Sequence, residues 1–166
     1  MKEMRQILIS LLCMVALAVS AQSVTKTTHK RAVKTDAVTT GTLTIRKPDY
    51  ICISTDGGKD QLIMEGTTFT MTVGGRQHVT DSHKNPQFAT FHKVLKAVIN
   101  QQTVPQGDDL TVVTKGNTTT VTIVPDGKKK RQLFTSFVLT VNAKTKALQT
   151  LRMNGRGEDY TLYEVK

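Results

Sequence analysis

Threonine and apolar residues alternate strictly along the segment 68–73, and this period of two constrains the fold more than any other feature. Successive side chains of a β-strand point to opposite faces, so Phe69, Met71 and Val73 share one face and the threonines share the other. The same alternation recurs in three further segments, 42–46, 61–65 and 120–123. Threonine favours strands, and 27 of the residues from 22 to 166 are threonine. The pattern predicts antiparallel strands that are each buried on one face.

Turn residues lie between these segments at the spacing expected of successive hairpins. The C-terminal strands are predicted over 110–115, 118–124, 133–141, 146–153 and 159–165. We expect about ten strands in all, together with one or two helices.

One segment has a helical period instead. Asn85 and Pro86 form an N-cap followed by proline in the first turn, and a helix is predicted to run from there to about Gln102. Its apolar stripe consists of Phe88, Phe91, Leu95, Val98 and Ile99. The predicted opposite face contains Lys93, Lys96 and Ala97. The stripe should therefore pack against the sheet, and the basic face should lie in water.

The first 21 residues have the pattern of a secretory signal peptide. Lys2 and Arg5 precede an apolar run over 7–19, and small residues follow up to Ala21. The run is shorter than the roughly 20 residues that span a bilayer. We expect cleavage after Ala21, a single domain over 22–166, and a periplasmic location.

The chain is basic, with 23 Lys and Arg against 13 Asp and Glu, a net charge of +10. Export argues against nucleic acid as the partner of this charge, although the charge alone would suggest it. After cleavage Cys52 is the remaining cysteine, so no intramolecular disulfide is expected. Export also argues against a cytosolic cofactor enzyme, and we expect no cofactor.

Candidate chemical motifs are weak. The spacing of His78, Asp81, His83 and His92 matches no firm metal signature, and a polar turn is the better interpretation. Ser82 lies beside Asp81 and His83, but no turn resembles an oxyanion site. Cys52, flanked by isoleucines, is interpreted as a buried strand residue. We expect neither a metal site nor an enzyme.

Several segments, taken in order, resemble the periplasmic outer-membrane lipoprotein carrier family, the LolA-like proteins. They are a strand with a lysine-proline corner, a hairpin, a helix, a resumed sheet and three closing strands, at 41–50, 65–71, 87–102, 109–112, 134–141, 148–153 and 157–163. The resemblance implies an incomplete, half-open antiparallel β-barrel with a helix packed over its concave face. It further implies a carrier that takes acylated outer-membrane lipoproteins, or lipid, from an inner-membrane release complex to the outer membrane.

Together with the apolar faces, this resemblance gives a hypothesis for the lipid-binding residues. They are Leu43, Ile45, Leu62, Met64, Phe69, Met71, Phe88, Phe91, Leu95, Val98 and Ile99. An apolar cup of this kind would stabilise each buried methylene of an acyl chain by roughly 0.8 kcal/mol.

An alternative function follows from the basic run Lys128, Lys129, Lys130 and Arg131, which comes after a Pro-Asp-Gly turn. In that interpretation the same fold has a filled core, and the basic run docks on anionic lipid or on an acidic partner in the cell envelope. A solvated loop is the simpler interpretation of such a run.

Overall fold

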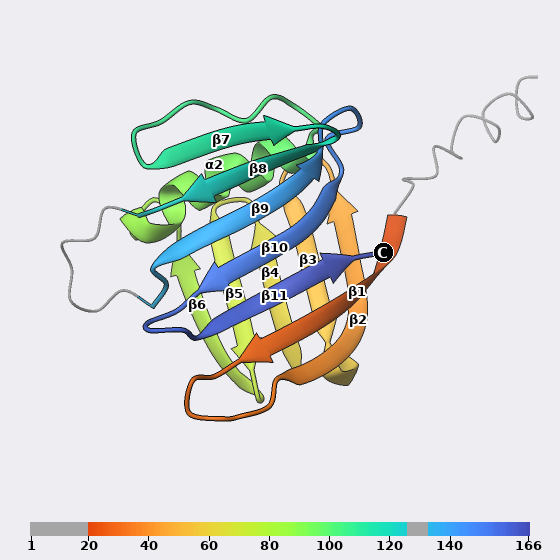
Figure 1. Cartoon of the computed structure of the whole chain (residues 1–166), viewed down its shortest axis with the longest axis vertical. Coiled ribbons are helices and arrows are strands. Elements are labelled where there is room, and N and C mark those ends of the chain that lie inside the picture. Colours follow the sequence, from red (N-terminus) through yellow and green to blue (C-terminus); the bar gives the residue numbers. More distant parts are fainter. Residues whose placement is uncertain (1–19, 126–132) are drawn as a thin grey trace, which may run out of the picture.

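The structure is a computed structural model that describes residues 20–125 and 133–166. Within these residues the chain forms one large sheet and an α-helix (Figure 1). The strands are β1 (Ser20–His29), β2 (Ala37–Arg46), β3 (Tyr50–Thr55), β4 (Asp60–Glu65), β5 (Thr68–Val73), β6 (Arg76–Asp81), β7 (Leu110–Lys115), β8 (Thr118–Ile123), β9 (Ser136–Asn142), β10 (Leu148–Asn154) and β11 (Tyr160–Val165). The helix is α2 (Pro86–Ile99), and a 3-10 turn, η1 (Asp56–Gly58), joins β3 to β4.

All neighbouring strands are antiparallel, in the order β6-β5-β4-β3-β2-β1-β11-β10-β9-β8-β7. Pairing of β1 with β11 joins an N-terminal wall, β1–β6, to a C-terminal wall, β7–β11. The outermost strands β6 and β7 do not pair with each other, so the sheet curls without closing into a barrel. The fold class predicted from the sequence, a half-open antiparallel β-barrel with one helix, is confirmed.

Helix α2 lies inside the curl, behind β8 and β9 in Figure 1. The side chain of its N-cap, Asn85, accepts a 3.2 Å hydrogen bond from the backbone N–H of Gln87, and Pro86 occupies the first turn, as predicted. The helix ends at Ile99 rather than near Gln102, because Gln101 adopts a left-handed φ of 55° that an α-helix cannot continue.

The buried arc of α2 is wider than the predicted stripe. Lys93 and Lys96 are exposed as expected, but Ala97 is only 7% exposed and Val94 is fully buried. The assignment of Ala97 to the solvent face was therefore wrong. The sheet reaches the helix from two walls, so a larger part of its circumference is covered than a single flat sheet would cover.

The chain's five phenylalanines meet in the core. Phe69 of β5 stacks on Phe91 of α2, with ring centroids 5.4 Å apart, and Phe91 stacks on Phe137 of β9 at 4.2 Å with an interplanar angle of 9°. This column of three rings connects the N-terminal wall, the helix and the C-terminal wall. Each such stacked pair stabilises the fold by about 0.5–1.5 kcal/mol beyond the contribution of its buried apolar area.

Several strand boundaries differ from those predicted; β10, for example, begins at Leu148 instead of residue 146. Strand β1 was not predicted over its observed length, because its threonine-rich and basic sequence lacks an apolar alternation. Strand β9 begins at Ser136 instead of residue 133, since the carbonyl of Phe134 accepts a hydrogen bond from the side chain of Gln87.

Most of the predicted signal peptide, residues 1–19, lies outside the described residues. Ser20 and Ala21 begin β1, where they pair with Ile45 and Thr44. Cleavage after Ala21 stays a prediction, and it would leave the register of β1 with β2 intact from Gln22 onward.

Candidate functional site

The eleven predicted lipid-binding residues converge on the concave face. Nine of them are at most 4% exposed: Leu43, Leu62, Met64, Phe69, Phe88, Phe91, Leu95, Val98 and Ile99. Ile45 and Met71 are half-buried and pack against the same cluster. The concave face is thus filled by the apolar side chains of α2. An apolar ligand could occupy this face only if α2 moved away from the sheet.

Two polar side chains fasten α2 to the N-terminal wall. The ring nitrogen Nε2 of His92 lies 2.8 Å from the carbonyl oxygen of Gly66, in the turn between β4 and β5. The side-chain amide of Asn100, the C-cap of the helix, donates a 2.7 Å hydrogen bond to the carbonyl of Pro48, in the turn between β2 and β3. Both partners are backbone carbonyls at the rim of the sheet.

Burial lowers the pKa of His92, and the positive charges of Lys96 and His83 lower it further. The carbonyl of Gly66 and the carboxylate of Asp49 act in the opposite direction without cancelling the shift. His92 is therefore biased toward its neutral form, in which Nε2–H donates to Gly66 while the other ring nitrogen is unprotonated.

Two further side chains fasten α2 to the C-terminal wall. The amide of Gln87, a buried polar group, donates a 2.8 Å hydrogen bond to the carbonyl of Phe134 just before β9. The hydroxyl of Thr90 donates to a carboxylate oxygen of Asp109, next to the first residue of β7. Side chains at both ends of α2 and between them thus form hydrogen bonds with both walls of the sheet. We call these four contacts, made by Gln87, Thr90, His92 and Asn100, the latches.

A strap, residues 102–107, leads from the helix toward β7. Most of its residues are exposed, whereas Val104 is half-buried and packs against the core. Backbone hydrogen bonds anchor its two ends, from Gln102 to the carbonyl of Ala97 and from Leu110 to that of Gly107. Few buried contacts hold the strap, which is typical of segments that open locally.

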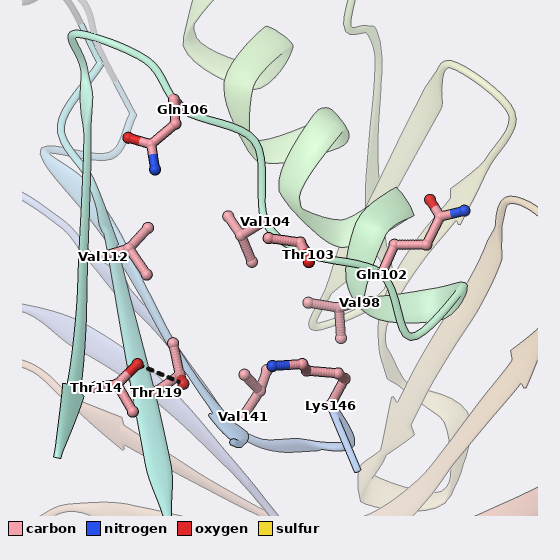
Figure 2. Close-up of a pocket in the computed structure, with 10 residues that line it drawn as sticks. All are labelled: Val98, Gln102, Thr103, Val104, Gln106, Val112, Thr114, Thr119, Val141 and Lys146. Atoms are coloured by element: carbon pink, nitrogen blue, oxygen red, sulfur yellow. Dashed lines mark hydrogen bonds between the residues drawn. The ribbon is translucent and has the colours of Figure 1, made fainter. Parts of the chain in front are cut away.

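A cavity of about 150 Å³ lies between the strap, the end of α2 and strands β7–β9 (Figure 2). Its lining comprises Val98, Gln102, Thr103, Val104, Gln106, Val112, Thr114, Thr119, Val141 and Lys146. Val98 is the member of this set that was predicted from the sequence. The valines on strands follow the period-two pattern and could have been found from it, whereas the loop position of Lys146 gives no such signal.

The residues considered for metal binding and catalysis do not form a reaction centre. The carboxylate of Asp81 accepts a 2.8 Å hydrogen bond from the backbone N–H of His83 in a polar turn, and His78 is exposed on β6. Ser82 is buried. Among residues 20–125 and 133–166, no three His, Cys, Asp or Glu side chains gather in a way that could hold a metal ion.

Cys52 lies half-buried on β3, as a strand residue, and burial is the main cause that raises the pKa of its thiol. The basic run Lys128, Lys129, Lys130 and Arg131 lies outside the described residues. Within the described part of the chain, α2 is too short and too polar to cross a bilayer, and no other helix there could do so.

Neither the known family models nor the curated proteins contain a match to this sequence. Solved structures do align with the chain over most of its length. The LolA superfamily protein NE2245 from Nitrosomonas europaea is 6% identical, with 91% of this chain and 85% of that one covered and a TM-score of 0.36. LprF from Mycobacterium bovis is 12% identical, with 90% and 85% covered and a TM-score of 0.37.

A putative outer membrane lipoprotein-sorting protein domain from Vibrio parahaemolyticus is 6% identical, with 88% and 82% covered and a TM-score of 0.38. At such low TM-scores the alignments assign no function to this chain.

Proposed function

We propose that the protein is a periplasmic carrier that binds the acyl chains of outer-membrane lipoproteins, or of lipid, beneath α2 and delivers them to the outer membrane. It acts by binding and release and performs no bond chemistry. The inner-membrane release complex and the acylated lipoproteins are its proposed partners.

One observation carries this proposal: the apolar face of an unclosed sheet is covered by a latched helix and a weakly held strap, with a cavity at their junction. A cover of this kind can separate from the sheet without breaking the pairing of any strand. The cavity volume, about 150 Å³, is similar to that of an engineered apolar cavity that admits benzene, and it is below the roughly 300–1,000 Å³ of ligand pockets. An acyl chain therefore enters only as the cover moves outward.

The free energies of burial permit an acyl chain to replace the side chains of α2 in the core. Withdrawing the six large apolar side chains of α2 that are buried in the core costs about 1.5–3 kcal/mol each, or roughly 9–18 kcal/mol together. Burying a chain of sixteen carbons returns about 0.8 kcal/mol per methylene, or roughly 12 kcal/mol. The two quantities are comparable, so the acyl chain can replace the helix, and it can leave again when another binding site competes for it.

The filled core favours a second candidate function. Nine predicted lipid-binding residues are already at most 4% exposed. In this alternative α2 stays in place, and the protein is a cell-envelope interaction module that docks through its basic residues, including the run 128–131, on anionic lipid or an acidic partner. Such docking weakens steeply with salt, whereas burial of an acyl chain does not.

Native mass spectrometry of the protein purified from a periplasmic extract tests the proposed function. We expect an acylated species to co-purify, or to load when the stripped protein is incubated with an acylated lipoprotein at physiological salt. The same lipoprotein without its acyl groups is the matched control and should not load. Absence of loading by the acylated form would refute the carrier function and leave the docking module.

A further inference from the structure

The ammonium group of Lys146 points into the cavity beneath the strap (Figure 2). Lys146 is half-buried in the turn between β9 and β10, with a left-handed φ of 60°. Its Nζ donates a 2.8 Å hydrogen bond to the carbonyl of Ala143 in the same turn. An ammonium has three donors, so this bond leaves two for other partners.

In the described part of the chain, no carboxylate lies within 4 Å of Lys146 Nζ, and the ion pairs found there involve other residues. The lining also contains the hydroxyls of Thr114 and Thr119, which are 2.9 Å apart and hydrogen-bonded to each other. A partly buried cation without an acidic partner favours an anion from outside the chain.

Apolar side chains also line the same cavity. They are Val98 of α2, Val104 of the strap, Val112 of β7 and Val141 of β9, and they alternate with the polar side chains of the lining. A ligand that satisfies the whole cavity must therefore present an anionic group and a hydrocarbon segment next to each other. This is the chemistry of a single-chain amphiphile such as a fatty acid.

We propose that the cavity holds the anionic end group and first methylenes of a fatty-acid-like amphiphile, with Lys146 as the ionic partner of that end group. This inference rests on the proposed function and deepens its lipid branch, since it names a lipid with a free anionic end group, which an ester- or amide-linked acyl chain of a lipoprotein does not have. A volume of about 150 Å³ accommodates the end group with a few methylenes, and the rest of the chain lies under the displaced cover.

Isothermal titration calorimetry of the processed protein with three probes tests the proposal. The probes are laurate, which has a chain and a charge, monolaurin, which has the same chain without a charge, and acetate, which has the charge without the chain. We expect laurate to bind at least tenfold more tightly than monolaurin, because a charge-assisted hydrogen bond contributes more than a neutral one. Acetate should bind too weakly to detect.

Three variants assign the effect to Lys146. Lys146→Met keeps the length of the side chain and should reduce the affinity for laurate to that for monolaurin. Lys146→Arg keeps the charge and should retain the preference. Lys144→Met removes an equal charge from an exposed residue of the same turn and should change nothing.

The outcomes separate the two proposals. Equal binding of laurate and monolaurin, or an unchanged preference in Lys146→Met, would overturn the anion site while supporting acyl-chain binding. Failure of both twelve-carbon probes to bind would instead count against the proposed function itself. Melting temperatures of the variants establish that each one is folded.

Discussion

The ammonium of Lys26 on β1 forms an ion pair with the carboxylate of Asp60 on β4, although two strands lie between them in the sheet. Both side chains lie on the concave face, where the curl of the N-terminal wall brings β1 and β4 together. Gly41 of the intervening β2 allows this curl, since a Cβ there would lie 1.9 Å from the carbonyl oxygen of Ser54. The ion pair therefore stabilises the curvature that creates the concave face.

Asp60→Asn should destabilise the fold by about 3 kcal/mol, because it leaves the largely buried charge of Lys26 without its partner. Burial by itself raises the pKa of Asp60, but Lys26 and the backbone N–H of Gly74 outweigh it, and the net effect lowers the pKa. Its stabilising contribution is thus present above the ordinary aspartate pKa of about 4 and is lost as the pH falls through the lower folded value. Urea denaturation between pH 2 and 7 measures this.

The matched control is Asp108→Asn, which changes an exposed aspartate and should leave stability within about 0.5 kcal/mol of the original. Replacing both members of the pair with apolar residues, in Lys26→Met/Asp60→Leu, should recover most of the loss. Equal stability of Asp60→Asn and Asp108→Asn would show that the ion pair contributes nothing.

Gln87→Ala should cost about 2 kcal/mol, since it removes the donor to the buried carbonyl of Phe134 and leaves that carbonyl without its partner. The N-cap is unaffected, because it uses the backbone N–H of residue 87. Hydrogen exchange should also become faster in the first turns of α2. The exposed Lys93→Ala on the same helix serves as the control, and similar exchange in both variants would contradict a latch at Gln87.

The latch at His92 predicts a loss of stability in mild acid. Burial lowers the folded pKa of His92 below its ordinary value of about 6.5, so the unfolded chain binds more protons in this range and stability falls as the pH drops from about 7 through the folded pKa. His92→Gln keeps a donor for the carbonyl of Gly66 and removes the titration. Urea midpoints from pH 5 to 8 should therefore become flatter in His92→Gln but not in the exposed control His78→Gln.

The stacked pair Phe91 and Phe137 should be energetically coupled. Their rings are parallel within 9°, and both side chains are fully buried. A double-mutant cycle with Phe91→Leu, Phe137→Leu and the double variant should give a coupling of about 1 kcal/mol. Urea denaturation supplies the four stabilities. Strictly additive effects would mean that the ring column does not connect helix and wall.

The sequence predicted the strands with alternating residues well, because a strand that is buried on one face has apolar residues at every second position. The helix start was equally clear, since Asn85 and Pro86 determine it locally. Strand β1 was missed because its buried position next to β11 depends on pairing with the other end of the chain, as in Val24 with Val165. Its inward side chain Lys26 is stabilised by an ion pair that the sequence pattern does not predict.

In the candidate site, too, the sequence predicts what depends on local pattern and does not predict what depends on contacts between distant segments. The apolar faces predicted the residues of the concave face because each follows the period of its own element, except that Val73, placed on the face of Phe69 and Met71, is exposed at the end of β5. Lipid binding by these residues stays a prediction. How full that face is, and where the cavity lies, depends on how the two walls close on α2. Ala97 and Val94 are buried through that closure, and Lys146 reaches the cavity from a turn whose sequence carries no apolar period.

The central claim is that an acyl chain enters only when α2 moves away from the sheet, and a disulfide across one latch tests it most directly. Thr90 and Asp109 have hydrogen-bonded side chains, so Thr90→Cys/Asp109→Cys in a Cys52→Ser background should tie the helix to the start of β7. Loading with an acylated lipoprotein is then measured by native mass spectrometry. We expect the oxidised variant to stay empty and the reduced variant to load like the Cys52→Ser parent; equal loading of the oxidised and reduced forms would contradict the account.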